Sequence, residues 1–376
     1  MFSVTLDMAI PHMRRSFVAA KKKITLTDIS SSAGVSLSTV SMILNARADV
    51  TFSHETVLKV RRTAEELGYK APTRRSRGLL PSRKAIIIVA PNIANAYYSG
   101  LIQAIQQEAE QHEFSTLIYT TYRDVQKEEE ILNMALAIGA AGMIFTLTPK
   151  SMLLVEKINR KLPIVIMGDR TSSSNVDTVE LDNYSAGMLL GRHMLGLGHT
   201  HIAFITAMMN SANSIRLHRL QGVLDAYEQE HDCTVHIFTR DHTPQEELHN
   251  VDIEQRIGYE LTLECLESDK PVSGFVAAND FIAYGVLEAL ADKGFHVPED
   301  YSVCGFNNLS SSRISKVGLT TVEHQAESRA HNAFKILMER IKGSQASSEI
   351  ERMEYSHQLL ERGSTAPCRK TPPAER

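Results

Sequence analysis

The chain has 376 residues, of which 43% are hydrophobic, so it can form two or three packed domains at roughly 150 residues per domain. No apolar run approaches the ~20 residues that cross a bilayer, and Arg14 and Arg15 follow the first apolar residues instead of preceding them, so we expect neither a membrane span nor a signal peptide. The four cysteines are far apart in the sequence, which argues against a disulfide framework or a zinc site and fits a reducing cytoplasm.

Charge is distributed unevenly along the chain. Residues 14–84 contain 15 Lys or Arg against 5 Asp or Glu, an excess of 10, and because the whole chain carries −4, the remainder carries −14. A basic end on an acidic body is typical of a protein that binds a polyanion at one end. A solvated basic face without a ligand is the alternative that charge alone leaves open.

The N-terminal part is interpreted as an extension, residues 1–22, followed by a small all-α domain, residues 23–70. The segment from Thr25 to Asp28 resembles a capping box that begins a first helix, and Gly34 allows a turn after it. Ser36 then caps a second helix. A third helix with similar apolar spacing completes a three-helix unit.

The composition changes after these helices. Residues 71–84 are rich in Arg, Ser, Gly and Pro, include five basic residues, and are interpreted as a hinge linker. From residue 85 to residue 363, short apolar runs alternate with helical segments, which favours parallel strands linked by right-handed crossovers. The expected strands lie at residues 85–90, 116–119, 142–145, 163–167, 202–206, 235–238, 274–277 and 301–306. Their two groups predict an α/β domain of two parallel-sheet subdomains, with a cleft at the carboxyl ends of the strands. We expect residues 364–376 to form a mobile tail.

The predicted N-terminal helices carry a motif with a defined chemistry. With Ala33-Gly-Val-Ser36 as the turn and Thr39-Val-Ser41 in the recognition helix, the segment 24–45 resembles the helix-turn-helix of the LacI/GalR repressors. In such a motif, hydroxyl side chains and a helix N-terminus contact phosphates while outward residues reach base edges in the major groove. The resemblance implies DNA contacts from Thr25, Ser36, Leu37, Ser38, Thr39, Ser41, Met42 and Asn45. A generic three-helix bundle is the alternative.

The recognition helix departs from the family at one position. Many members carry Arg where this chain has Met42. Arginine can bind guanine through two hydrogen bonds, whereas the methionine thioether is only a weak acceptor. We therefore expect base readout from Leu37 and Ser38, with apolar contact from Met42.

The linker contains Ser76-Arg-Gly-Leu79, which resembles the Ala-Arg-x-Leu of the family's hinge helix. The resemblance adds Arg77 and Leu79 to the DNA contacts, since in the family a leucine from each subunit of a dimer inserts into the minor groove and kinks the operator. Gly78 lowers helix propensity by up to ~1 kcal/mol relative to Ala, so we expect the hinge to fold only on DNA. A plain flexible linker is the alternative.

The rest of the chain resembles the family's periplasmic-binding-protein-like sensor domain. The matching segments are Asn95-Ala-Tyr-Tyr98, Gly168-Asp-Arg170, Arg219-Leu-Gln-Gly222, Ala278-Asn-Asp280 and Gly305-Phe-Asn-Asn308. The resemblance implies an effector site formed by Tyr97, Tyr98, Asp169, Asn213, Arg219, Asn279, Asp280 and Asn307. Arginine and polar groups can bind hydroxyls or carboxylates, and aromatic rings can cover a sugar or a base. Alternatively, Arg219 and Asp280 form ordinary ion pairs and the tyrosines belong to the core; for Asp280 this structural role is favoured.

These features predict a homodimeric repressor whose affinity for an operator in double-stranded DNA changes when a small effector, such as a sugar, sugar acid or nucleobase, closes the cleft. No cofactor, metal or catalytic residue is expected, because no phosphate-binding loop, metal-ligand spacing or nucleophile-elbow motif is found. A periplasmic-type binding protein is the alternative, but it needs an export signal and no DNA-binding domain. The sequence leaves open the identity of the effector and whether the effector induces or corepresses. It also leaves open the operator sequence and the involvement of a protein corepressor.

Overall fold

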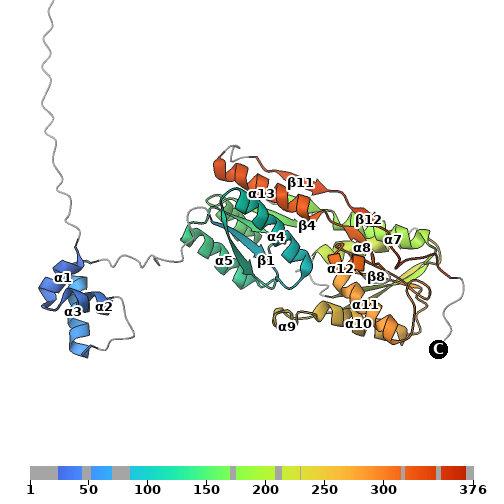
Figure 1. Ribbon diagram of the computed structural model, residues 1–376, viewed down its shortest axis with the longest axis horizontal. Helices are drawn as coiled ribbons and strands as arrows, with labels where there is room; N and C mark the ends of the chain where they lie inside the picture. Colours follow the sequence, from blue (N-terminus) through green and yellow to red (C-terminus); the bar gives the residue numbers. More distant parts are fainter. Residues whose placement is uncertain are drawn as a thin grey trace, which may run out of the picture. The chain divides into compact units, whose positions relative to one another are not determined.

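The computed structural model describes residues 24–44, 52–69, 85–169, 175–207, 214–228, 230–314, 318–343 and 349–369. The chain divides into two compact units, Met1–Leu80 and Pro81–Arg376. Within the described ranges, the first unit is helical and the second contains two six-stranded sheets (Figure 1). None of the described helices is long and apolar enough to cross a membrane.

The first unit consists of α1 (Leu26–Ala33), α2 (Leu37–Leu44) and α3 (His54–Glu66) around one core. The predicted capping box is confirmed: the backbone amide of Thr25 donates to the Asp28 carboxylate (2.8 Å), and the Asp28 amide donates to the Thr25 hydroxyl (3.4 Å). Gly34 ends α1 at a φ of 64°, a left-handed conformation that other residues adopt only at a cost. Buried residues of all three helices form the core: Ile29, Ala33, Val40, Ile43, Val60 and Ala64.

The first subdomain of the second unit contains an entirely parallel sheet in the order β2-β1-β3-β4-β5-β11. Its strands are β1 (Ala85–Ala90), β2 (Ser115–Thr120), β3 (Gly142–Phe145), β4 (Ile164–Asp169), β5 (Asp177–Leu181) and β11 (Arg352–Tyr355). Its helices are α4 (Ala96–Gln111), α5 (Val125–Ile138), α6 (Met152–Asn159) and α13 (Ala326–Lys342). Alternate residues of β1 face opposite sides: Ile86 joins the core under α4 and α13, and Ile87 joins the core under α5 and α6. Both faces of the sheet are therefore covered.

The second subdomain repeats this strand order, as β7-β6-β8-β9-β10-β12, and only β12 is antiparallel to its neighbour. Its strands are β6 (His201–Ala207), β7 (Thr234–Arg240), β8 (Gly274–Ala277), β9 (Ser302–Phe306), β10 (Thr320–Glu323) and β12 (Gln358–Leu360). Its helices are α7 (Asn183–Gly196), α8 (Ser214–Glu228), α9 (Pro244–His249), α10 (Ile253–Leu266), α11 (Asp280–Asp292) and α12 (Ser310–Ile314). In each sheet, strand order reverses next to the first strand of the subdomain, which is where open α/β sheets bind ligands.

The chain passes between the subdomains at three places: between β5 and α7, between β10 and α13, and between β11 and β12. The second crossover returns the chain to the first subdomain, where Phe334 and Leu337 of α13 pack in the core beneath α4. Figure 1 shows α13 and β11 lying along the first subdomain, although they come late in the sequence. Three crossovers can act together as a hinge between two rigid bodies.

All eight predicted strands are present, but the structure adds β5, β10, β11 and β12. These four were missed because their sequences are not apolar runs. The buried strand β5 reads Asp-Thr-Val-Glu-Leu, and Asp177 at its start is compensated by Arg340 of α13, whose Nε lies 2.6 Å from the carboxylate. Tertiary pairing, which the local sequence does not reveal, makes these polar strands possible.

The prediction of a mobile tail from residue 364 is wrong for residues 364–369. The Ser364 hydroxyl is fully buried, accepts from the Thr320 amide (2.8 Å) and donates to the Val303 carbonyl (2.5 Å). Nε2 of His199 lies 3.0 Å from the carbonyl oxygen of Ala366. Hydrogen bonds to two strands thus hold this segment on the second subdomain, and residues 370–376 lie outside the described ranges.

Candidate functional site

The exposed face of the helix-turn-helix includes the beginning of α2. Leu37 is 48% exposed and Ser38 is exposed, whereas Val40 and Ile43 are buried in the core of the unit. Of the other predicted DNA contacts, Thr25 and Ser36 are exposed, and Thr39, Ser41 and Met42 are half-buried. Asn45, Arg77 and Leu79 lie outside the described residues.

Hydroxyl groups gather at the N-terminus of α2. The Ser36 oxygen accepts from the Thr39 amide (3.1 Å) and lies 2.7 Å from the Ser38 hydroxyl and 2.8 Å from the Thr39 hydroxyl. The first amides of a helix have no partner within the helix and carry partial positive charge, so they attract anions. The chemistry of this end of α2 therefore suits a phosphate, and Leu37 and Ser38 are exposed next to it.

A cleft lies between the two subdomains where both sheets reverse their strand order. Asn95 follows β1, Thr146 follows β3 and Asn279 follows β8, so carboxyl ends of strands from both sheets reach it. The cavity that remains between the lining side chains is only about 40 Å³, well below the roughly 300–1,000 Å³ typical of small-molecule sites, so in this structure the cleft is largely filled by its own side chains. Of the predicted effector residues, those that line the cleft are Tyr97, Tyr98, Arg219, Asn279 and Asn307. Asn213 lies outside the described residues.

Arg219 projects from α8 and is only 5% exposed. Its guanidinium donates from Nε to the Asn183 side-chain oxygen (2.9 Å), from Nη1 to the Ala278 carbonyl (2.7 Å) and from Nη2 to Nε2 of His324 (2.8 Å). It also lies over the ring of Phe306, 4.5 Å from the centroid. Burial lowers the pKa of Arg219 to about 10, so the group is still charged at neutral pH.

Close packing of α7 and α8 fixes the position of Arg219. A Cβ atom on Gly187 would lie 2.0 Å from the Arg219 carbonyl oxygen, and one on Gly222 would lie 2.1 Å from the Tyr184 carbonyl oxygen. Only glycine at these positions allows the two backbones to approach so closely. Gly222, which ends the predicted Arg-x-x-Gly segment, therefore helps to fix the position of Arg219 relative to α7.

A chain of hydrogen bonds links Arg219 to all three crossovers. His324, just after β10, accepts from Arg219 and has its Nδ1 3.3 Å from Nδ1 of His357, which lies between β11 and β12. The other ring nitrogen of His357 donates to the carbonyl oxygen of Asp182, between β5 and α7 (2.7 Å). Burial, with the nearby Arg219 charge, holds the pKa of His324 well below its usual value, so the ring is neutral and can accept.

Arg329 is a cleft residue that the sequence analysis did not identify. It lies in α13 and is 1% exposed. Its Nη1 donates to the hydroxyl of Tyr97 (2.7 Å), its Nη2 lies 3.5 Å from the Val179 carbonyl, and its Nε is buried without a partner among the described residues. Arg329 therefore lines the cleft and keeps one unused donor.

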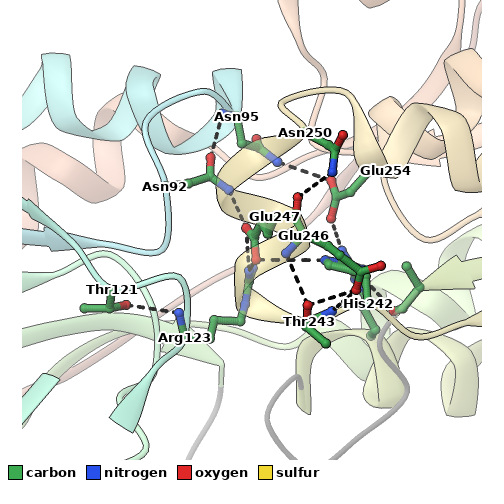
Figure 2. A network of polar contacts seen from close by, with 12 residues as sticks. Asn92, Asn95, Thr121, Arg123, His242, Thr243, Glu246, Glu247, Asn250 and Glu254 are labelled. Carbon is green, nitrogen blue, oxygen red and sulfur yellow. Dashed lines mark hydrogen bonds and ion pairs between the residues drawn. The ribbon is translucent and has the colours of Figure 1, made fainter. Parts of the chain in front are cut away.

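Polar contacts join the two subdomains across the cleft (Figure 2). Arg123, after β2, pairs with Glu247 of α9 (3.1 Å), and Asn92, after β1, donates to the same carboxylate. Figure 2 shows a second group around Glu254, to which the Asn95 amide donates (3.3 Å).

Glu254 also pairs with Arg216 within the second subdomain. Burial alone would raise the pKa of Glu254, but the charges of Arg216 and Arg123 outweigh it and hold that pKa below its usual value. Glu254 is therefore a carboxylate, and Arg216 and Arg123 each have an acidic partner.

Two predicted effector residues, Asp169 and Asp280, are buried beside the cleft and bound by protein groups. Asp280 accepts from the Leu309 amide (2.9 Å) and the Ser312 hydroxyl (2.6 Å), and burial raises its pKa to about 6. The Asp169 carboxylate lies 2.5 Å from Nδ1 of His218, a group of the opposite subdomain. In this structure both carboxylates connect elements of the fold, and Asp280 does so through hydrogen bonds.

Four charged residues of the cleft were missed: Arg123, Arg216, Glu254 and Arg329. Arg216 had a signal, because it precedes Arg219 by three residues and shares its helix face. Arg329 had none, because its burial depends on a crossover that returns α13 to the first subdomain.

Comparisons with known proteins agree with this architecture. The model of the bacterial regulatory proteins of the lacI family matches residues 25–71, and the periplasmic binding protein-like domain matches residues 192–365. The chain is 26% identical over 343 residues to the HTH-type transcriptional repressor PurR of Actinobacillus pleuropneumoniae, covering 90% of this chain and 98% of that protein. It is 29% identical over 308 residues to the HTH-type transcriptional regulator DegA of Bacillus subtilis, covering 80% and 86%.

Solved structures share the fold. A LacI family transcriptional regulator from Enterococcus faecium with bound ribose superposes with a TM-score of 0.64 at 25% identity, covering 76% of this chain and all of that one. The lac repressor dimer bound to operator and the anti-inducer ONPF superposes with a TM-score of 0.62 at 22% identity, covering 92% of this chain and all of that one.

The helix-turn-helix and the two-subdomain sensor define the chain as a DNA-binding transcription regulator under the control of a small ligand. The chain belongs to the LacI family of bacterial regulatory proteins.

Proposed function

We propose that this protein acts in the cytoplasm as a homodimeric repressor whose affinity for its operator changes when a small polar ligand occupies the cleft. The observation that carries the proposal is the hydrogen-bond chain from Arg219 in the cleft to all three crossovers. A ligand that contacts Arg219 changes the surroundings of the residue at which this series of hydrogen bonds ends. Ligand binding and subdomain movement are thereby linked.

The proposed DNA surface is the exposed N-terminal part of α2, with Leu37 and Ser38 reaching base edges. Thr25, Ser36 and Thr39 position the unit on phosphates, and the hinge residues Arg77 and Leu79 reach the minor groove of the operator. The uneven charge of the chain supports this arrangement, because the N-terminal part is strongly basic.

The proposed ligand site consists of Tyr97, Tyr98, Arg219, Asn279 and Asn307. Aromatic faces and amide groups of this kind suit a sugar, a sugar acid or a nucleobase. The ribose bound to the Enterococcus faecium regulator supports a ligand of about the size of a single sugar. The curated relatives are transcriptional regulators, so we propose no catalytic activity for the cleft.

The experiment is selection of a DNA site from a random pool with the full chain, followed by fluorescence anisotropy with that site across a salt series. Each neutralised phosphate contributes a slope of about −0.9 in log K against log salt, so the basic N-terminal part gives a steep dependence. Candidate ligands, identified because they raise thermal stability, are then added. A flat salt response, or no selected site, contradicts the DNA-binding function; operator affinity that no cleft ligand alters contradicts control by a ligand.

A further inference from the structure

Positive charges predominate among the residues that line the cleft. Arginine occupies four lining positions, Arg123, Arg216, Arg219 and Arg329, whereas among the described lining residues the only carboxylate is Glu254. Two of these arginines have acidic partners: Arg123 pairs with Glu247, and Arg216 pairs with Glu254. Their charges are therefore compensated within the protein.

The other two arginines are not paired in this way. Arg219 is 5% exposed and Arg329 is 1% exposed, and within the described part of the chain neither forms an ion pair with a carboxylate. The groups that accept from them are neutral: the Asn183 amide, a hydroxyl, backbone carbonyls and the neutral ring of His324. Burial lowers the pKa of Arg219, and the charge of Asp169, which raises that pKa, offsets the effect of burial only in part. Burying a charged group without an ion-pair partner is costly, so both arginines favour an anion in contact with them.

The two groups differ in the donors that they have left. Arg219 uses its Nε and both terminal nitrogens in hydrogen bonds shorter than 3.0 Å. Arg329 makes one short bond, to Tyr97, and its Nε has no partner among the described residues. A guanidinium that lines a cleft and keeps an unused donor can bind the oxygens of a carboxylate or a phosphate.

We propose that the effector is an anion, a small polyhydroxy compound bearing a carboxylate or a phosphate, and that Arg329 binds this group with Tyr97 while Arg219 supplies the second positive charge. The inference rests on the proposed function, because it names the chemistry of the ligand in the same cleft. A neutral sugar could accept hydrogen bonds from Arg329 but would leave both arginines without an ion-pair partner. An anion compensates them, and it therefore binds more tightly than its neutral analogue.

The test uses the full chain and matched probes: D-ribose, D-ribonate, D-ribose 5-phosphate and inorganic phosphate, at constant ionic strength, with chloride as the reference. Thermal unfolding and calorimetric titration measure stabilisation and affinity. We expect at least one anionic probe to bind at least about tenfold more tightly than ribose. The ribonate and phosphate samples separate a carboxylate ligand from a phosphate ligand.

Arg329→Met is the decisive variant. Without ligand it should unfold at the same temperature as the wild type or at a higher one, because an uncompensated buried charge has been removed. Its affinity for the anionic probe should fall roughly ten- to hundredfold. Arg240→Met is the matched control, since Arg240 pairs with Glu260 and Glu264 away from the cleft lining, and it should leave the affinity for the anion unchanged.

If Arg329→Met does not fold, Arg329→Lys replaces it: lysine keeps the charge but loses the two-pronged geometry, so anion affinity should fall about tenfold. The proposal is overturned if none of the anionic probes stabilises the wild type more than ribose does, or if the Arg329 variants bind them as the wild type does. Operator binding is measured on the same samples. Anion binding without any change in operator affinity supports the anion site and contradicts ligand control. A neutral probe that alone changes operator affinity supports ligand control and overturns the anion site.

Discussion

Two glycines of α7 provide a matched pair of substitutions with opposite expected effects. In Gly187→Ala, the new Cβ would lie 2.0 Å from the Arg219 carbonyl oxygen, and a backbone atom cannot rotate away. Ordinary contact requires α7 and α8 to separate by roughly 1.5 Å. Overpacking of this kind costs about 1–3 kcal/mol, partly offset by up to ~1 kcal/mol of helix propensity. The melting temperature should therefore fall by about 2–8 °C.

Gly196→Ala, in the last turn of the same helix, is the control. No heavy atom lies within 4 Å of a Cβ at that position, so this variant gains only helix propensity and should be equally stable or melt up to about 4 °C higher. Calorimetry gives both melting temperatures, and ligand titration shows whether displacement of Arg219 weakens binding in Gly187→Ala alone. A Gly187→Ala variant as stable as Gly196→Ala would refute the close approach of α7 and α8.

Three further changes test separate parts of the account. Met42→Arg should shift base preference toward guanine at one position of each half-site, worth about 1–3 kcal/mol, and an unchanged preference after selection from a random pool would show that Met42 does not face a base. Because burial raises the pKa of Asp280 to about 6, above its unfolded value, the folded state binds the extra proton and its stability falls as pH rises from about 4 to 6. Asp280→Asn should remove this component, up to roughly 3 kcal/mol, so urea unfolding at low and neutral pH should show a smaller pH dependence than in the wild type; an equal dependence would contradict the burial argument. His357→Phe removes the hydrogen bonds that connect His324 to the Asp182 carbonyl, so ligand affinity should change little while the effect of the ligand on operator affinity decreases. An undiminished effect of the ligand on operator affinity in this variant would show that these hydrogen bonds do not link the two sites.

The sequence predicted the helix-turn-helix and eight strands because those segments obey simple periodicities. The capping box from Thr25 to Asp28 and the left-handed Gly34 are local features, and so are apolar runs such as β1. Two of the strands that escaped prediction contain buried polar residues: β5 contains Asp177, whose partner Arg340 is distant in the sequence, and β10 contains Thr320 and Thr321. Local sequence does not carry that information.

The candidate site was partly predictable for the same reason. Tyr97, Asn279 and Asn307 follow strands or begin helices, and Arg219 belongs to the short Arg-x-x-Gly segment of α8, so all four lie in recognisable motifs, and all four reach the cleft. Arg329 comes from the first turn of an amphipathic helix, α13, whose position depends on a crossover between subdomains. The positive charge of the cleft is therefore a property of the tertiary structure.

The most direct test of the central claim is operator affinity measured by fluorescence anisotropy with and without a cleft ligand, for the wild type and for Arg219→Gln. The wild type should change its operator affinity when the ligand is added. The variant should bind the operator as well as the wild type does, because α2 belongs to the other unit of the chain, but it should need roughly ten- to hundredfold more ligand to respond. An operator affinity that a bound ligand does not alter, or a stable variant that responds at the wild-type ligand concentration, would contradict the account.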